Sequence, residues 1–494
     1  ALDDIVVSIA TRTRVDVTPV VDASAALDLG FAYVDGRTPS DTILREPTLE
    51  IIPVAPATRS SAGIDGGAVG GGYEHLLVWS FVFQRAEEGA RWEMLVDAHT
   101  GEVLSLEDIN HYAQQQVKGG VYPLTNTGVC GAPTQCGILQ TGWPMPFANT
   151  GLAAPNNFTN SAGVLDFTGG TLTTTLNGRF VRISDNCGAI SASSTTGALD
   201  LLGANGQHDC TTPGFGGAGN TPASRSAFYE VNKLAEQARG WLPTNTWLQA
   251  QITANVNINL NCNAFWNGST INFYRTGSGC RNTGEIAAIF DHEWGHGLDD
   301  NDALGVLSNS SEAYADIAAI YRLQASCVGF GFFDNSSLSD QGCGLSADGT
   351  GFNTQEALTG ASYCATDCSG VRDTDYQKHV PATAATPLGF VCAQCTTGTG
   401  PCGRQVHCAA APVRQAAWDL VARDLVAPPF SLDSQSAYIV GNKVFYQGSG
   451  NVGAWHSCTC PSTSAGCATA NGYIQWITAD DDNGNLNDGT PHMT

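Results

Sequence analysis

Apolar residues recur at helical spacing at several places from residue 225 onwards. In segment 225–242, Phe228, Val231, Leu234 and Ala235 follow the 3.6-residue period, which predicts a helix with one buried face. The same reasoning predicts further helices over 284–297, 310–324 and 412–425. The C-terminal part of the chain is therefore expected to be mainly helical.

Strand-like patterns dominate the N-terminal part. Segment 75–84, "HLLVWSFVFQ", partly alternates and is rich in β-branched and aromatic residues, which predicts a strand. Segment 91–107 predicts a second strand, a turn over 97–101 and a third strand. These strands belong to a region without cysteine, which we interpret as a small α+β domain over 1–114.

A further strand-like segment precedes the helical part. In segment 252–274, Val256, Ile258 and Leu260 alternate with polar residues. Strands before helices predict an α+β protein rather than alternating strand and helix units. The predicted organisation has three parts, a small domain, a β-rich region and a mainly helical region: 1–114, 115–298 and 299–494.

The composition excludes several classes of partner. The 494 residues include 46 acidic and 22 basic side chains, for a formal net charge of −24. Such a charge argues against nucleic acid or anionic lipid as a partner.

No stretch approaches the length of a membrane span, and the first residues lack the charged start and apolar run of a signal peptide. We therefore expect neither feature in this chain.

Seventeen cysteines indicate an oxidising compartment, and hence a secreted protein. Their number is odd, so one is free or bonds outside the chain. Cysteines close in sequence are expected to form local disulfides: Cys130–Cys136, Cys187–Cys210 and Cys262–Cys280.

The segment "CAQCTTGTGPCGRQVHC" holds four of these cysteines, Cys392, Cys395, Cys402 and Cys408. Its Cys-x-x-Cys spacing is compatible with a structural zinc site. In a secreted, cysteine-rich chain, disulfides are the favoured interpretation. A bridge at Cys408 would also brace the neighbouring His407.

Candidate chemistry is concentrated in "FDHEWGHGLDD", residues 290–300. On a helix that stops near Gly297, His292 and His296 lie one turn apart on one face and can bind the same ion. Zinc suits imidazole ligands, and a catalytic zinc needs a third protein ligand and one open position. Glu293 would then deprotonate the attacking water. The alternative is an ordinary helix with two surface histidines.

The third ligand is expected from "SNSSEAYADIAAIYRL", residues 308–323. Glu312 could complete the zinc site, and Asp316, one turn later, could accept the free N–H of His292 and hold its tautomer. The alternative is a capping box, with Asn309 as the N-cap and Glu312 at the third helical position. The short separation from the two histidines favours the ligand.

The segment "ADDDNGNLNDGTPH", residues 479–492, is a candidate calcium loop. Oxygen-bearing side chains surround a turn glycine, Gly484, as in known calcium sites. An exposed acidic turn is the equal alternative. The candidate ligands are Asp480, Asp482 and Asp488.

The motif "HEWGH" followed by "EAYAD" resembles the gluzincin metallopeptidases, the thermolysin-like and fungalysin-like enzymes. "NAFWNGS" (263–269) resembles their edge strand that pairs with an extended peptide, and "VHCAAAPVRQAAWDL" (406–420) resembles the helix start with their catalytic histidine. The resemblance covers roughly 117–425. It implies a two-lobed catalytic domain, with a β-rich lobe, a mostly helical lobe and an active-site cleft between them.

The resemblance also implies a role for each matching residue. His292, His296 and Glu312 would bind zinc, and Glu293 would act as the general base. His407 would stabilise the oxyanion of the reaction. The remaining matches would bind the substrate: Asn263, Ala264 and Arg372.

The chain also departs from the family pattern. The usual tyrosine partner of the oxyanion has no counterpart, and Ser308 lies nearest to its place. The spacing from His296 to Glu312 is shorter than in thermolysin, and the cysteine content is foreign to that enzyme. Taken alone, His407 could be a packed core histidine, and 263–266 a buried aromatic strand.

The N-terminal domain resembles the PepSY and FTP types of prodomain, through "WEMLVDAHTGEVLS". The resemblance implies a zymogen whose own N-terminal domain acts as an intramolecular inhibitor or chaperone, with cleavage near 112–118. The alternative is a permanent N-terminal domain with a chaperoning or docking role.

The expected function is that of a secreted zinc endopeptidase that hydrolyses peptide bonds of extracellular proteins through a zinc-activated water. The alternative is a retired peptidase fold with a structural or binding role at the cell surface. A peptidase fold that has lost catalysis usually lacks a metal ligand or the general base. This sequence keeps the three candidate ligands and Glu293.

Overall fold

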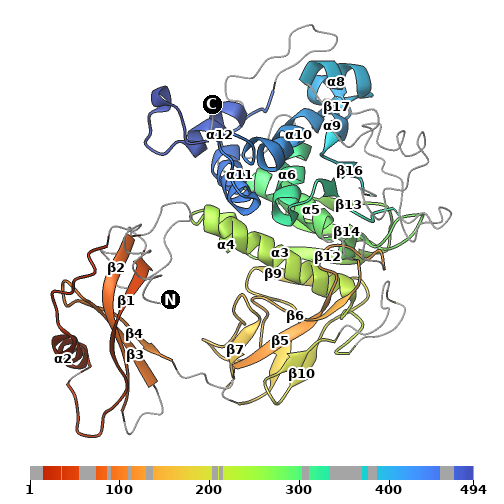
Figure 1. Cartoon of the computed structure of the whole chain (residues 1–494). Helices are drawn as coiled ribbons and strands as arrows, with labels where there is room; N and C mark the ends of the chain where they lie inside the picture. Colours follow the sequence, from red (N-terminus) through yellow and green to blue (C-terminus); the bar gives the residue numbers. More distant parts are fainter. Residues whose placement is uncertain are drawn as a thin grey trace. The chain divides into compact units, whose positions relative to one another are not determined.

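The protein is described from a computed structural model, in which the chain forms two compact units, Ala1–Ala113 and Gln114–Thr494. Helices and strands are both abundant, which confirms the α+β class (Figure 1). The structure describes these residues: 15–34, 36–54, 74–85, 91–109, 114–128, 137–167, 169–202, 210, 215–302, 311–333, 370–376, 387–456 and 472–492.

The described part of the first unit is an antiparallel sheet in the order β1-β2-β3-β4 with helix α2. The strands predicted over 75–84 and 91–107 are confirmed, and the turn between the latter two is held by Asp97, whose Oδ1 accepts the N–H groups of His99 and Thr100. The elements are α2 (Ala23–Tyr33), β1 (Thr42–Val54), β2 (Glu74–Gln84), β3 (Arg91–Asp97) and β4 (Val103–Asp108).

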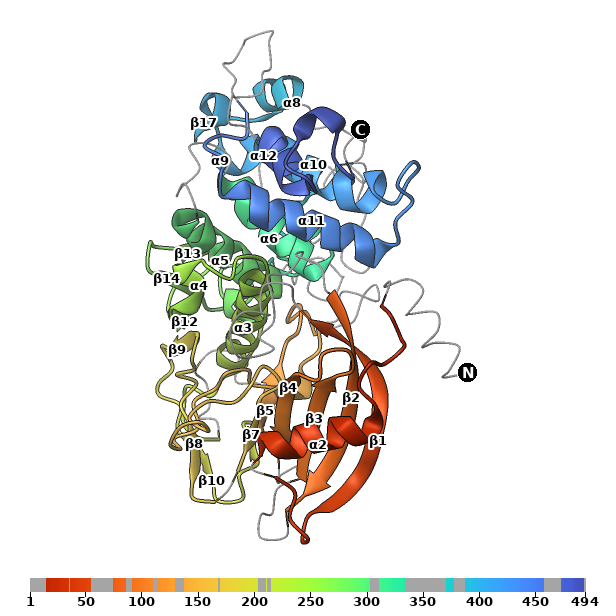
Figure 2. The same cartoon turned by 90° about the vertical axis from the view of Figure 1, so that its left-hand side faces the viewer.

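Helix α2 covers one face of this sheet (Figure 2). Asp22 caps the helix by accepting the N–H of Ala25. Phe31 packs on Phe81 and Phe83, with ring centroids 6.2 and 4.8 Å apart. Gly30 permits this close approach, because a Cβ there would lie 2.6 Å from the Phe81 ring. The first unit therefore has a core of its own.

The second unit begins with short strands in three sheets. One has the order β11-β5-β6 with β7 on β5, one pairs β10 with β8, and one has the order β13-β14-β12-β9. The strands are β5 (Gln114–Val121), β6 (Gln140–Pro144), β7 (Val164–Asp166), β8 (Leu172–Thr174), β9 (Val181–Asp185), β10 (Ala192–Ser194), β11 (Leu199–Asp200), β12 (Ile252–Ile258), β13 (Ala264–Trp266) and β14 (Thr270–Tyr274).

The strand prediction over 252–274 is confirmed in type but wrong at Leu260. Strand β12 ends at Ile258, and Leu260 is 56% exposed. The alternation breaks at Asn257, which has a left-handed φ of 54°. Its side chain is turned inward, where Nδ2 donates to the Asp185 carboxylate.

Helix α3 (Pro222–Trp241) lies between the strands of the second unit and its C-terminal helices (Figures 1 and 2). It matches the predicted helix over 225–241 and starts three residues earlier, because Thr221 caps it and Pro222 suits its first position. Val231 and Leu234 are completely buried in the main core of the unit.

Two adjacent helices carry the predicted zinc motifs, α5 (Ala287–Asn301) and α6 (Ser311–Leu323). The prediction that α5 stops at Gly297 is wrong, because this glycine serves close packing instead. A Cβ there would lie 2.9 Å from the Trp247 ring. The helix continues to Asn301, whose Nδ2 donates to the Gly297 carbonyl.

Apart from α4, which lies between α3 and β12, the remaining elements follow α6. The helix predicted over 412–425 is present as α10, and its last turn is a π-helical turn over Leu420–Asp424. The other elements are α4 (Thr246–Gln249), β15 (Cys327–Val328), β16 (Arg372–Asp373), α8 (Pro387–Gln394), β17 (Thr397–Gly400), α9 (Val406–Ala409), α10 (Ala411–Asp419), α11 (Ser434–Ser449) and α12 (Gly472–Asp480).

Disulfides brace the second unit. Two predicted bridges are confirmed, Cys187–Cys210 and Cys262–Cys280, while Cys130–Cys136 lies outside the described residues. Cys395 bonds to Cys408, so the cysteine-rich segment uses disulfides as expected. Within the described part of the chain, no helix is long and apolar enough to span a membrane.

Candidate metal centre

Helices α5 and α6 bring three potential metal ligands together. Nε2 of His292 lies 3.3 Å from Oε2 of Glu312, and Nε2 of His296 lies 3.7 Å from Oε1 of the same carboxylate. One ligand atom from each residue falls within 4.8 Å of the other two. His292 is only 5% exposed, which contradicts the alternative of two surface histidines. Asn309, the N-cap of the other alternative, lies outside the described residues.

The charges of this cluster are strongly coupled. Burial favours the neutral forms, but hydrogen bonds that His292 donates to Asp316 and Glu312 overcome this effect and raise the pKa of His292 to about 9. Burial and the neighbouring His292 lower the pKa of His296 to about 4. The pKa of Glu312 is held below its usual range against burial, by the hydrogen bond from His292. Metal binding requires His292 to lose its proton.

Asp316 orients His292 by contacting Nδ1, the ring nitrogen that does not face Glu312. Its Oδ1 lies 2.9 Å from Nδ1 of His292, which leaves Nε2 toward Glu312. The Asp316 carboxylate is completely buried, yet its pKa is lowered, because Arg372 and His292 overcome the effect of burial. This is the arrangement predicted for Asp316, a carboxylate that fixes the tautomer of a ligand histidine.

The cluster opens into a cavity of about 490 Å³. Glu293 lines it beside His292 and His296 and is 7% exposed. Burial raises the pKa of Glu293 to about 7, although the backbone of Trp266 donates a hydrogen bond to the carboxylate. A carboxylate in this position can exchange a proton near neutral pH.

His407 reaches the same cavity from α9. Its Nε2 lies 3.4 Å from Oε2 of Glu312, and its side chain is 38% exposed, so it is not a packed core histidine. Burial and the positive charge of Arg372 lower its pKa to about 4. The bridge from Cys408 to Cys395 fixes the backbone beside it, as expected from the sequence.

Strand β13 forms one wall of the cavity. Asn263 and Ala264 line it, together with Trp266. Among the described strands, β13 is at the edge of its sheet and pairs only with β14, in antiparallel register. An edge strand beside a cavity can accept an extended peptide by main-chain hydrogen bonds. The Cys262–Cys280 bridge anchors the chain next to it.

Arg372 lines the cavity and also contacts Asp316 and the candidate ligand His292. It donates from Nε and Nη2 to the Asp316 carboxylate at 2.9 and 2.8 Å. Its Nη2 also lies 3.3 Å from Nδ1 of His292. The structure thus gives Arg372 a second task, the orientation of Asp316, beside the predicted contact with substrate.

The candidate calcium residues are not gathered in one place. Asp480 is buried, and its two oxygens accept the backbone N–H of His492 and face its Nδ1 at 2.8 Å. Asp488 accepts a hydrogen bond from Asn483, and Asp482 is exposed. Among the described residues, these three carboxylates do not form a group that could hold a metal.

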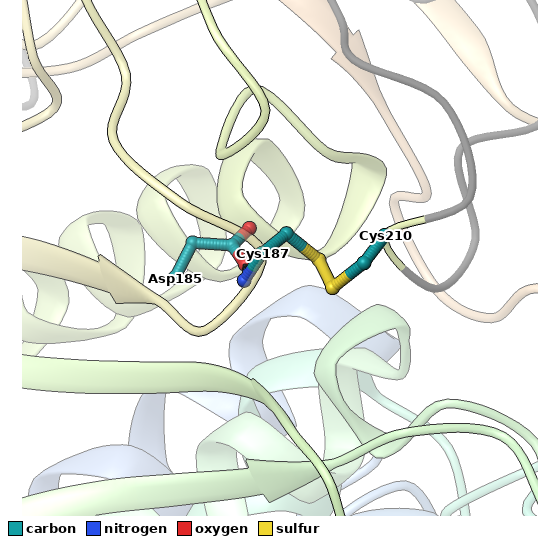
Figure 3. Close-up of side chains that lie close together, drawn as sticks. All are labelled: Asp185, Cys187 and Cys210. Carbon is teal, nitrogen blue, oxygen red and sulfur yellow. Dashed lines mark hydrogen bonds between the residues drawn. A yellow bond between two sulfur atoms is a disulfide. The ribbon is translucent and has the colours of Figure 1, made fainter.

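A second cluster has metal-ligating side chains but is explained by a disulfide (Figure 3). Cys187 and Cys210 are bonded to each other, so neither is a thiolate. Asp185 beside them accepts hydrogen bonds from Thr221 and Ser224 at 2.7 Å each. These contacts satisfy the carboxylate and give it a structural role.

The sequence reasoning missed two residues around the site. Arg414, completely buried, donates from Nη1 to the His407 carbonyl at 2.6 Å and to Asp316 at 3.3 Å. Gln405 lies with Nε2 2.6 Å from Nδ1 of His407. A lone arginine in the small-residue helix "APVRQAAWD" was a signal for the first. Nothing in the sequence distinguishes Gln405.

No protein-family model and no curated protein matches this chain. The resemblance to gluzincins therefore rests on the sequence motifs.

Proposed function

We propose that the protein is a secreted, zinc-dependent endopeptidase of the gluzincin type. One observation carries the proposal. His292, His296 and Glu312 converge at a cavity that also holds a buried carboxylate, Glu293, on the same helix. A structural metal site has no need of such a carboxylate or of an open cavity.

The donor set suits zinc. Two imidazoles and one carboxylate are three of its usual ligands, and the cavity leaves room for a fourth position. Hard cations such as calcium and magnesium prefer oxygen ligands instead. When bound, zinc would polarise the scissile carbonyl and lower the pKa of the attacking water.

The protein side chains supply the remaining chemistry. Glu293 takes a proton from the attacking water and passes it to the leaving amine, which its pKa near neutrality favours. His407, across the cavity, donates a hydrogen bond to the developing oxyanion. Asp316, held by Arg372 and Arg414, keeps His292 in the tautomer that binds the metal.

Substrate is bound as an extended chain. The edge strand β13 at Ala264, with Asn263 just before it, would pair with the substrate backbone, and Arg372 would contact a substrate carbonyl. The cavity is also lined by four apolar side chains, which supports a preference for an apolar side chain next to the scissile bond. These side chains are Ile289, Phe332, Phe333 and Val371.

The same proposal covers the rest of the chain. The second unit would be the two-lobed catalytic domain, with β-rich residues 115–298 and mainly helical residues 299–494. The first unit would be a PepSY- or FTP-like prodomain that inhibits or chaperones it in a zymogen. The disulfides support an oxidising, extracellular location.

Hydrolysis of an internally quenched, end-blocked peptide tests the proposal, with and without a zinc chelator and before and after limited proteolysis near residue 115. Cleavage that the chelator abolishes is expected, together with its loss by about 10²- to 10⁴-fold in Glu293→Gln. That variant should still bind one zinc ion. Cleavage retained in Glu293→Gln would refute the mechanism. An inactive chain after proteolysis would point to a retired peptidase fold.

A further inference from the structure

Gln405 lies at a junction between a helix cap and the candidate oxyanion donor. It is the N-cap of α9, and its Oε1 accepts the backbone N–H of Cys408 at 2.8 Å. Its Nε2 lies 2.6 Å from Nδ1 of His407. One side-chain amide therefore contacts both the backbone and the imidazole of the same short helix.

The cap determines which end of the amide faces the ring. If the amide were turned over, its NH₂ group would face the N–H of Cys408, and two donors would oppose each other. Oε1 of Gln405 therefore accepts the hydrogen bond from Cys408, and the NH₂ group faces Nδ1 of His407. Since an amide NH₂ only donates, Nδ1 of His407 must be an acceptor.

An accepting Nδ1 leaves one arrangement of the ring proton. The protonated ring and the Nδ1–H tautomer both carry a hydrogen at Nδ1, which the amide hydrogens oppose. The proton of the neutral ring then lies on Nε2, the atom that faces the cavity 3.4 Å from Glu312.

The backbone on both sides of this ring is also held. Arg414 donates to the His407 carbonyl at 2.6 Å, and the next residue, Cys408, is bonded to Cys395. The direction of the Nε2–H bond is thus set by the cap, the arginine and the disulfide together. Donors fixed before the reaction stabilise a developing charge without a cost of reorganisation.

We propose that Gln405 is a positioning residue that holds His407 in the Nε2–H tautomer, so that the neutral ring donates to the oxyanion. The inference rests on the proposed peptidase function for the role of His407. It assigns the orienting role to an uncharged amide, so the donor needs no carboxylate partner at Nδ1.

Nitrogen-15 NMR of the ring tests the tautomer directly. The protein is labelled at its histidine rings, loaded with zinc, and His407 is identified by the signals lost in His407→Phe. A proton-free Nδ1 and a protonated Nε2 are expected. In Gln405→Glu the cap acceptor and side-chain length are kept, but an acceptor replaces the donor, so Nδ1 should gain a proton. A protonated Nδ1 in the unaltered protein, or an unchanged Nδ1 in the variant, would overturn the proposal.

Kinetics separate this role from simple capping. Gln405→Ser keeps a good N-cap but cannot reach Nδ1. We expect its kcat to fall about 10- to 100-fold with KM nearly unchanged, since the donor acts on the transition state. The matched control is Gln435→Ser at an exposed position in the first turn of α11, with unchanged kcat. Full activity of Gln405→Ser would mean that Gln405 is only a cap.

The kinetic and NMR experiments together also distinguish a failure of the proposed peptidase function from a failure of the proposed role of Gln405. A chain that cleaves no peptide after proteolysis would refute the peptidase, while the NMR arm would still decide whether Gln405 sets the tautomer. An active enzyme with a protonated Nδ1 would refute only the role of Gln405.

Discussion

The Nδ1 of His292 lies 2.9 Å from the Oδ1 of Asp316, a carboxylate that is completely buried. The contact joins α5 to α6 and directs the other nitrogen of the ring to Glu312. Arg372 and Arg414 contact the same carboxylate and keep it charged. Removal of the Asp316 charge should therefore weaken metal binding by His292.

Asp316→Asn is expected to weaken zinc binding by about 10- to 100-fold, because the amide holds the His292 tautomer less firmly. Competition with a chromophoric chelator measures the zinc affinity. Asp166→Asn, at an exposed position at the end of β7, is the matched control and should bind zinc normally. Equal affinities of the two variants would show that Asp316 does not orient the ligand.

Much of the candidate metal site was predictable because its signal is local. Two histidines four apart share a helix face whatever surrounds them, so His292 and His296 needed only the prediction of a helix. Glu312 and Asp316 followed from the same spacing on a second helix. The pairing of Asp316 with His292 was predicted from the usual surroundings of ligand histidines, and the structure confirms it.

The rest depends on contacts between distant parts of the chain. Arg414 donates a hydrogen bond to Asp316, which lies 98 residues earlier in the sequence. Gly297 does not end α5, because Trp247 packs on it. The alternation in β12 broke at Asn257, where a buried hydrogen bond to Asp185 outweighs the strand pattern. Tertiary packing determines such contacts, and the periodicity of apolar residues in the sequence carries no information about them.

Zinc affinity is expected to rise with pH between about 6 and 9. Despite burial, Asp316 and Glu312 raise the pKa of His292 to about 9, so a proton must leave before the ring can bind the metal. At lower pH more of the protein holds that proton, and zinc competes less well. Titrations at pH 6, 7 and 8 measure the trend, and a pH-independent affinity would contradict it.

Metal removal should also lower stability. Zinc binds the folded cluster and not the dispersed ligands, so a chelator is expected to reduce Tm, and added zinc to restore it. Differential scanning calorimetry with and without chelator measures this. In His296→Ala, which lacks one ligand, the chelator should have little effect on Tm. A chelator shift as large in that variant as in the unaltered protein would show that the metal binds elsewhere.

Asp302 predicts a separate pH effect on stability. Burial raises its pKa to about 7, although the hydroxyl of Tyr314 donates to it at 2.8 Å. The folded state thus holds the proton more tightly than the unfolded state, and the contribution of this group to stability falls as pH rises from about 4 to 7.

Asp302→Asn keeps the acceptor for Tyr314 but cannot ionise, so it should gain stability relative to the unaltered protein as pH rises through this window. Urea unfolding at pH 5 and pH 8 measures the difference in free energy of unfolding. Asp166→Asn serves again as the exposed control. A difference that is the same at both pH values would show that Asp302 ionises normally in the folded state.

Gly295 sets the distance between the two helices of the metal site. A Cβ at this position would lie 2.8 Å from the Cα of Ala315 on α6 and 3.2 Å from the Cβ of Ala318. Since the nearest atom belongs to the backbone, a side-chain rotation cannot relieve the contact. Gly295→Ala must therefore move α6 away from α5, and Glu312, one turn before Ala315, moves with it.

We expect Gly295→Ala to weaken zinc binding and to lower the free energy of unfolding by about 1–3 kcal/mol, the usual cost of overpacking. Alanine favours a helix more than glycine does, so propensity alone would stabilise the variant by up to about 1 kcal/mol. The two effects have opposite signs, and urea unfolding decides between them. Gly453→Ala, where no atom lies within 4 Å of the added Cβ, is the control. A Gly295→Ala variant with increased stability and normal zinc affinity would show that the helices can separate without disturbing the ligands.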